Sequence, residues 1–337
     1  MIEKTKKFST KQIPIDYNMT EKAKKISVKQ FLIDYNTYLI LLLLIIISSL
    51  LSDTFLTTMN IRNILLQQAG PILVAIGMLF VILTGGIDLS VGSIMAIGAT
   101  TSAIFINDLG MSTLPAILVA LIIGTVFGIF TGILVAYAGI QGFVASLATM
   151  TIARGVAFII TEGRPIKVES GTLDVLVSKD LLFPIILITA VLIVMFTLAQ
   201  KYTGWGRIVI AIGSNQTAVQ LAGIRTKRYI MSTYAVSAAL STLAGIFIAA
   251  RTSTGSATIG VAQELDAIAA CVIGGASLAG GKGFVLKTVA GGLILALIGN
   301  IMNLMAVPSY PQDIIKGFII IAAVLLQILT NKKEKTV

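Results

Sequence analysis

The sequence has no histidine, one cysteine and few charged residues. Charged residues make up 12% of the 337 residues, and aromatic residues make up 7%. The absence of histidine removes the side chain that most often transfers protons near neutral pH and that most often binds metals. Because Cys271 has no partner in the chain, an internal disulfide scaffold and a clustered thiolate metal site are excluded. The sequence therefore predicts no catalytic residue, no metal site and no cofactor.

Apolar residues are abundant instead, at 56% of the chain with a mean hydropathy of +0.96. A soluble domain would have to bury nearly all of these segments in one core, so water is not the expected solvent. One helical span needs about 20 mostly apolar residues, which leaves room for about ten spans. We predict an all-α, polytopic bundle of transmembrane helices, with apolar runs at 38–52, 65–84, 91–106, 114–138, 143–160, 182–199, 229–250, 265–278, 285–305 and 314–329.

Lysine and arginine are concentrated in segments that this map places on one side of the membrane. Of the 25 basic residues, 17 lie in four such segments, at 1–36, 200–228, 282 and 331–337. Cytoplasmic loops are enriched in these residues, so we predict that both termini are cytoplasmic. The predicted membrane domain covers 37–330, includes a cytoplasmic loop at 200–229 and is followed by a basic tail. Because the net charge of +10 gathers in these segments rather than on one face, no nucleic-acid partner is predicted.

The first 36 residues form a basic tail that contains a duplication. Residues 4–18 match residues 22–36 at ten of fifteen positions. The repeat indicates either a recent local duplication or a true start at Met19, which opens the second copy. Its lysines are expected to anchor the topology or to contact anionic headgroups of membrane lipid.

The loop at 200–228 contains five basic residues, no acidic residue and a candidate short helix. Ser214 or Asn215 is a typical N-cap, and Gly223 is a typical terminator about two turns later. A short helix on the cytoplasmic side is suited to insert into a groove on a partner protein and to transmit its movement. An ordinary connecting loop with a solvated basic face is the alternative interpretation.

Polar residues inside the apolar runs are the other functional candidates, because such residues are expensive in hydrocarbon. Asp88 and Ser90 follow two glycines, and their side-chain oxygens are placed to cap the next helix; contact with a transported solute is the alternative. Arg154 lies well inside the run at 143–160. We expect it to pair with an acid or with backbone carbonyl groups.

Four later polar residues complete the candidates for a translocation pathway. Glu264 and Asp266 are two residues apart, so they point to different faces of a helix and only one need line the pathway. Asn300 and Asn303 share one helical face at a spacing of three. Amide groups on this face either bind a passing polyol weakly or hold neighbouring helices together.

The sequence contains five long blocks, in this order: TGGIDLSVGSIMAIGA (84–99), LATMTIARGVAFIITEGRPI (147–166), GRIVIAIGSNQTAVQLAGI (206–224), ELDAIAACVIGGASLAGGKG (264–283) and YPQDIIKGFIIIAAVLL (310–326). Together they resemble the permease subunits of ribose-type and other simple-sugar importers of the ATP-binding cassette class. The resemblance covers the chain from about residue 35 to the last apolar run. The duplicated tail is the visible departure from the family pattern.

This resemblance implies a subunit that forms a monosaccharide pathway with a second copy of the permease. It implies a separate cytoplasmic ATPase as the energy source and an extracytoplasmic sugar-binding protein that delivers the substrate. The family's ATPase-coupling element corresponds here to ten residues: Ser214, Asn215, Gln216, Thr217, Ala218, Val219, Gln220, Leu221, Ala222 and Gly223. Within it, Gln216, Ala218, Leu221 and Ala222 are the expected contacts with the ATPase groove.

The glycine-rich segment near Lys282 is not a nucleotide site. A P-loop needs glycine five residues before a Gly-Lys pair and serine or threonine after it, whereas the chain has Ala276 and Gly283 at those positions. The subunit itself is therefore expected to be non-catalytic. An ion-coupled secondary transporter is the alternative function, but such proteins often use carboxylate or histidine relays within the membrane, and few deep carboxylates are present here.

Overall fold

The computed structural model describes residues 35–169, 171–178 and 183–334. The chain divides into one unit at Met1–Asn36 and a second at Thr37–Val337, and only the second is discussed below. Almost all of the duplicated tail lies outside the described residues, so the predictions about it remain predictions.

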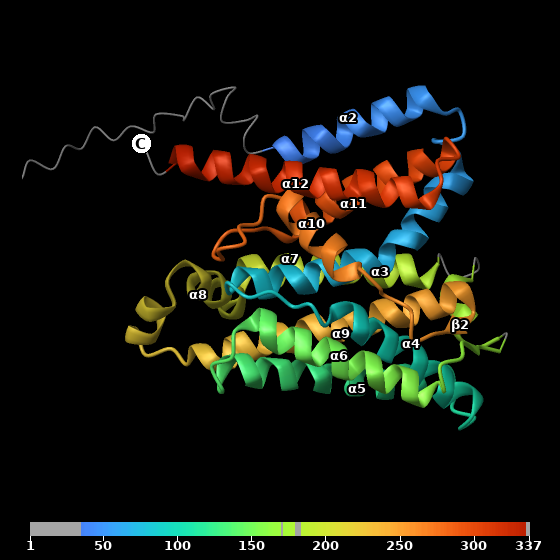
Figure 1. Ribbon diagram of the computed structural model, residues 1–337, viewed down its shortest axis with the longest axis horizontal. Coiled ribbons are helices and arrows are strands. Elements are labelled where there is room, and N and C mark those ends of the chain that lie inside the picture. Colours follow the sequence, from blue (N-terminus) through green and yellow to red (C-terminus); the bar gives the residue numbers. More distant parts are fainter. Residues whose placement is uncertain (1–34, 170, 179–182, 335–337) are drawn as a thin grey trace, which may run out of the picture. The chain divides into compact units, whose positions relative to one another are not determined.

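The described residues of the second unit form helices and connecting loops, with two short strands. Every predicted apolar run overlaps a helix. The α-helices are α2 (Asn36–Leu51), α3 (Thr58–Leu83), α4 (Val91–Asn107), α5 (Thr113–Ala136), α6 (Gly142–Ile160), α7 (Pro184–Tyr202), α8 (Gly204–Leu221), α9 (Thr226–Thr252), α10 (Gln263–Ile273), α11 (Val285–Leu304) and α12 (Ser309–Glu334). A 3-10 helix, η1 (Leu173–Val177), and the antiparallel pair β1 (Ile166–Lys167) and β2 (Thr254–Gly255) lie at the opposite end of the bundle from α8 (Figure 1).

Six of these helices, α3, α5, α6, α7, α9 and α11, are long and apolar enough to cross a membrane. The apolar helices α2 and α4 are shorter, with 16 and 17 residues. The fold is thus an all-helical membrane bundle. The total number of spans and the side on which each terminus lies remain predictions.

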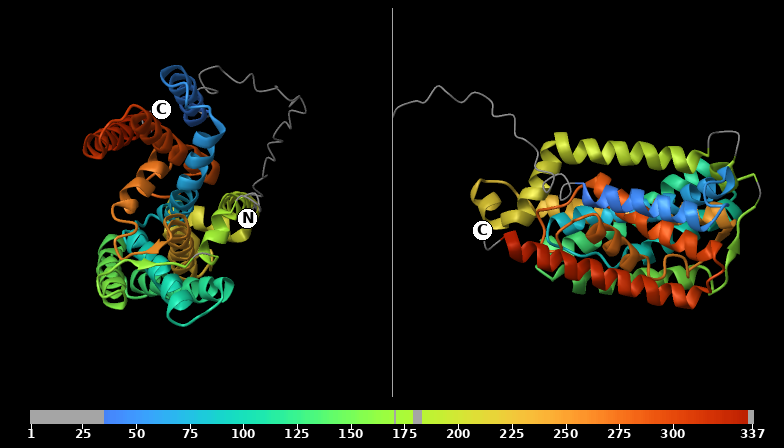
Figure 2. Two further views of the ribbon diagram at one scale, coloured as in Figure 1. Left: turned by 90° about the vertical axis from the view of Figure 1, so that its right-hand side faces the viewer. Right: turned by 90° about the horizontal axis from the view of Figure 1, so that it is seen from above.

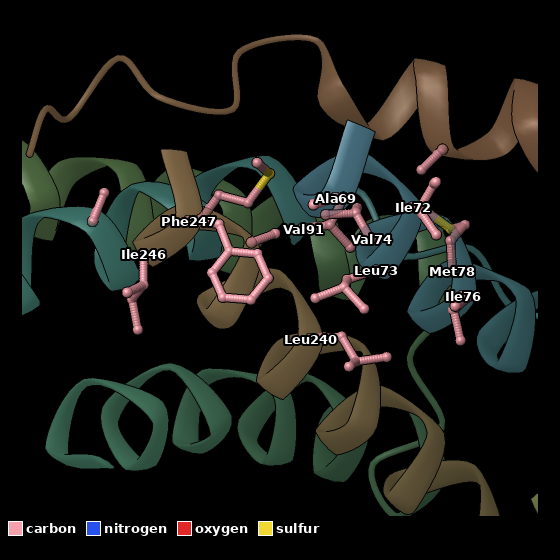
Figure 3. Packing of buried hydrophobic residues seen from close by; sticks show 14 of the residues in the cluster. Ala69, Ile72, Leu73, Val74, Ile76, Met78, Val91, Leu240, Ile246 and Phe247 are labelled. Carbon is pink, nitrogen blue, oxygen red and sulfur yellow. The ribbon is translucent and has the colours of Figure 1, made fainter. Parts of the chain in front are cut away.

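Helix α9 occupies the centre of the bundle and packs against α3, α4 and α5 (Figure 1). In its most apolar window, 72% of the residues are buried inside the protein. Its side chain Leu240 lies beside Leu73 of α3, and Phe247 lies beside Val91 of α4 (Figure 3). Small residues permit the close approach, as expected for helices that associate in lipid.

Two helices begin in the interior of the bundle rather than at its ends. After Leu83 the chain leaves α3, runs back as non-helical backbone and starts α4 at Val91. The first turn of α4 meets the segment just before α10, because a Cβ added to Gly92 would lie 2.0 Å from the carbonyl oxygen of Gly260. Helix α10 has only 11 residues, about 16 Å at 1.5 Å per residue. It ends at Ile273, so the run predicted at 265–278 is helical over only part of its length.

Candidate functional site

A polar cavity of about 190 Å³ lies between α3, α10, α11 and α12. We call it the amide cavity, because amide side chains dominate its lining. Its polar residues are Gln67, Gln68, Gln263, Asp266, Asn300, Asn303, Gln312 and Lys316. Of these residues, only Asp266, Asn300 and Asn303 were predicted from the sequence as pathway candidates. The adjacent glutamines of α3 were a usable signal, since they interrupt an otherwise apolar run.

Both asparagines of α11 also connect helices. Asn300 and Asn60 exchange two hydrogen bonds through their amide groups, at 3.1 and 2.8 Å. Asn303 Oδ1 accepts a hydrogen bond of 2.8 Å from Gln312 Nε2 of α12. The two interpretations of the amide face are therefore compatible, because the same side chains join helices and line a cavity.

A second cavity, of about 490 Å³, lies between α4, α6 and the start of α10. We call it the arginine cavity. It is lined by Ser93, Met150, Thr151, Arg154, Gly155, Phe158, Val261, Ala262 and Glu264. One guanidinium nitrogen of Arg154 donates hydrogen bonds to the carbonyl oxygens of Ala257 and Ile259 in the segment before α10. The predicted pairing of this arginine with backbone carbonyl groups is thus found.

The first turn of α10 separates the two cavities. Glu264 lines the arginine cavity and Asp266 lines the amide cavity, as expected for residues two apart on a helix. Between them, Leu265 is 54% exposed. Figure 2 shows α10, in orange, between α12 in red and α6 in green. Polar and ionisable groups are therefore gathered along one face that runs from α6 across α10 to α12.

Asp88 and Ser90 are placed differently, since both are completely buried and neither lines the amide or arginine cavity. Asp88 Oδ1 accepts hydrogen bonds from the backbone nitrogen and the hydroxyl group of Ser90, at 3.0 and 2.5 Å. Its Oδ2 accepts one from the Ser237 hydroxyl of α9 at 2.9 Å. Asp88 thus holds Ser90, the N-cap residue of α4, whereas no side chain makes a capping bond to a backbone nitrogen within the helix.

Replacing Asp88 with alanine should strongly destabilise the protein. The change leaves the Ser90 and Ser237 hydroxyls without their buried acceptor, and each buried polar group left unsatisfied costs about 1–3 kcal/mol. Thermal unfolding in detergent will measure the loss. Asp108→Ala is the matched control, because Asp108 is an exposed residue at the other end of α4. Equal melting temperatures for the two variants would contradict this role.

Helix α8 consists of two parts that meet at Asn215. The first part is capped by Thr203, whose hydroxyl accepts from the backbone nitrogen of Gly206 at 3.1 Å. At Asn215 the backbone leaves the helical region, with φ −162° and ψ 92°. The Asn215 side chain then accepts from the backbone nitrogen of Ala218 at 2.9 Å. Asn215 is therefore the N-cap of a short second part, which ends before Gly223 at φ +79°. The sequence predicted both the cap and the terminator.

The second part of α8 presents an exposed surface at one end of the bundle (Figure 1). Of residues 214–223, only Val219 is buried, and it packs with Ile212 and Tyr234. Leu221 is 84% exposed, which is unusual for a large apolar side chain at a helix end. Gln220 donates a hydrogen bond of 3.1 Å to the Thr226 hydroxyl at the start of α9. The surface thus presents one large apolar side chain, Leu221. The neighbouring Gln220 holds it to the start of α9.

The first part of α8 lies directly against the end of α3 and the loop that follows α10. A Cβ added to Gly213 would be 1.9 Å from the carbonyl oxygen of Leu83 and 2.4 Å from the backbone nitrogen of Gly281. That nitrogen donates a hydrogen bond of 3.0 Å to the Leu83 carbonyl oxygen. We call residues 274–283 the glycine loop. It connects α8 to α10, and through α10 to both cavities.

Comparisons with known proteins agree with the helical membrane architecture. Residues 60–324 match the family described as branched-chain amino acid transport system / permease component. The ribose import permease protein RbsC of Haemophilus influenzae is 39% identical over 86% of this chain and 91% of its own length. RbsC of Escherichia coli is 39% identical over 87% of this chain and 92% of its own, and RbsC of Bacillus subtilis is 39% identical over 86% and 91%. None of the solved structures matches the chain.

The matched region contains both cavities and the whole of α8. Members of this family are non-catalytic transport components, and the six long apolar helices make the chain a multi-pass protein of the bacterial cell membrane. The relatives match over nearly their full length, so the similarity is not limited to one motif. The chain therefore belongs to the family of permease components of the branched-chain amino acid transport system type.

Proposed function

We propose that this chain forms the membrane pathway of an ATP-driven importer for a monosaccharide, with ribose as the first candidate. Three of its relatives are named ribose import permeases and share 39% of aligned residues with it. Conversion of ATP energy belongs to a separate cytoplasmic ATPase, and delivery of the sugar belongs to an extracytoplasmic binding protein.

The observation that carries the proposal is the polar face from α6 across α10 to α12. Ionisable side chains inside a membrane domain usually face protein or water rather than lipid, because exposure to hydrocarbon is costly. Arg154, Glu264, Asp266 and Lys316 all line cavities on this face. We therefore place the pathway along α10, between this chain and a second copy that presents the same face.

Within this pathway the candidates have different roles. Glu264 and Asp266 line its two cavities, while Asn300 and Asn303 contribute amide groups to one of them. Asp88 and Ser90 lie behind this lining and hold the start of α4 in place. A weak polar lining suits a permease that receives its substrate from a binding protein, since tight binding would slow release.

The second part of α8 is the proposed docking element for the ATPase. Gln216, Ala218, Leu221 and Ala222 are exposed at the end of the bundle that carries the basic loop. Ser214, Asn215, Thr217, Val219, Gln220 and Gly223 complete the coupling element by capping, supporting or ending it. The contact of Gly213 with Leu83 then transmits the movement of the docked helix to α3 and the glycine loop.

Reconstitution tests this function. The chain is inserted in proteoliposomes with its ATPase, and uptake of labelled ribose is measured with the binding protein present. We expect uptake that requires ATP, the ATPase and the binding protein together. Uptake by the chain alone, driven by a proton or sodium gradient, would show the alternative, a secondary transporter.

A further inference from the structure

The arginine cavity contains a buried hydroxyl group that the fold leaves without a partner. Ser93, in the first turn of α4, is completely buried, and its Oγ makes no hydrogen bond with the described residues. Leaving such a group unsatisfied costs about 1–3 kcal/mol. Ser93 nevertheless lines the cavity. The hydroxyl is covered in this structure, so a ligand recovers this cost when a small outward movement of the cavity wall uncovers the Oγ.

The other walls of this cavity have the chemistry of a sugar site. Arg154 offers donors, Glu264 offers acceptors, and Thr151 adds a hydroxyl. Phe158 and Met150 add apolar surface against which the C–H face of a sugar ring can pack. Since one basic and one acidic group are both present, a neutral polyhydroxylated molecule fits better than an ion of a single charge sign.

The size of the cavity fits a small molecule. Its volume of about 490 Å³ is within the range of about 300–1,000 Å³ that is typical of ligand sites. The amide cavity, at about 190 Å³, is below that range. Of these two cavities on the polar face, the arginine cavity is therefore the better match for a whole monosaccharide.

The cavity is also placed where movement of α10 would change it. Glu264 is on α10, Ser93 is on α4, and Arg154 on α6 is bonded to the segment that leads into α10. The carboxylate lies against the first turn of α4, because a Cβ on Gly92 would be 2.8 Å from Glu264 Oε2. A shift of α10 relative to α4 would therefore separate the donors and acceptors that a bound sugar needs.

We propose that the arginine cavity is a transient binding station for a neutral monosaccharide, in which the Ser93 hydroxyl, Arg154 and Glu264 hydrogen-bond to the sugar. This inference rests on the proposed function and deepens it by placing the substrate at one site. It assigns a binding role to Ser93 and Arg154, neither of which was predicted from the sequence as a substrate contact.

The test compares two serine variants. Ser93→Ala removes the buried hydroxyl from the cavity. Ser241→Ala is the matched control, because Ser241 on α9 is also completely buried, has an Oγ without a partner and lines neither cavity. Each variant is reconstituted with the ATPase and the binding protein, and labelled ribose uptake is measured per ATP hydrolysed. This ratio does not depend on the amount of active complex.

We expect Ser93→Ala to lower uptake per ATP by about two- to tenfold, the effect of losing one hydrogen bond, and Ser241→Ala to keep the wild-type ratio. An unchanged ratio in Ser93→Ala would overturn the station. Failure of Ser93→Ala to fold would overturn it too, since the hydroxyl would then have a structural partner. Absence of ATP-dependent uptake by the wild-type complex would instead refute the proposed function itself.

Discussion

Leu221→Glu should leave the permease folded and abolish most ATP-driven import. Leu221 is 84% exposed, so glutamate at this position disturbs no packing within the chain. If the second part of α8 inserts into a groove on the ATPase, Leu221 is its apolar anchor, and interface anchors of this kind contribute about 2 kcal/mol or more. Uptake and co-purification of the ATPase should both fall by on the order of tenfold or more.

Leu109→Glu provides the matched control. Leu109 is 63% exposed and follows α4, whose end lies away from α8 in Figure 1. The control variant should retain the ATPase on purification. If Leu221→Glu also retains it, with normal import, then α8 is not the docking element.

Gly213→Ala should uncouple ATP hydrolysis from transport. The new Cβ would meet the backbone of Leu83 and Gly281 at 1.9 and 2.4 Å. Because both neighbours are backbone atoms, no side-chain rotation relieves the clash, and α8 has to move away from α3 and the glycine loop. Overpacking of this kind costs about 1–3 kcal/mol. Import per ATP hydrolysed should decrease on the order of tenfold, while the exposed second part of α8 still binds the ATPase.

Gly204→Ala isolates this effect from a general change in helix propensity. Gly204 begins the same helix, and a Cβ there has no atom within 4 Å. The control should keep the wild-type coupling ratio. Normal coupling in Gly213→Ala would show that contact between α8 and the glycine loop does not carry the movement.

Hydropathy predicted the helices well, because each apolar run needs burial in lipid or protein and a helix satisfies its own backbone. Hydropathy overestimated the length of α10, because buried apolar residues outside a helix give the same signal. The segment after Ile273 remains apolar, and Ala276 is completely buried, but Gly275 at φ +81° turns the chain into a loop. Hydropathy reports burial rather than conformation, so it cannot distinguish a buried loop from the continuation of a helix.

The site was predictable where it depends on local sequence. Asn215 and Gly223 act on their own helix, so their roles follow from residue type and spacing. The cavities depend on how separate helices pack, which one sequence does not reveal. Gln67 and Gln68 were at least conspicuous in an apolar run. Ser93 was not, because a serine in a membrane helix usually serves close packing.

The glycine contacts around α9 determine which parts of the protein can move. Gly77 of α3, Gly98 of α4 and Gly124 of α5 each bring their helix within touching distance of α9; a Cβ on Gly98, for example, would be 2.3 Å from the Thr242 carbonyl oxygen. Interlocked backbones resist sliding or rotation, because any shift creates overlap. We therefore expect these four helices to move as one solid body during a transport cycle.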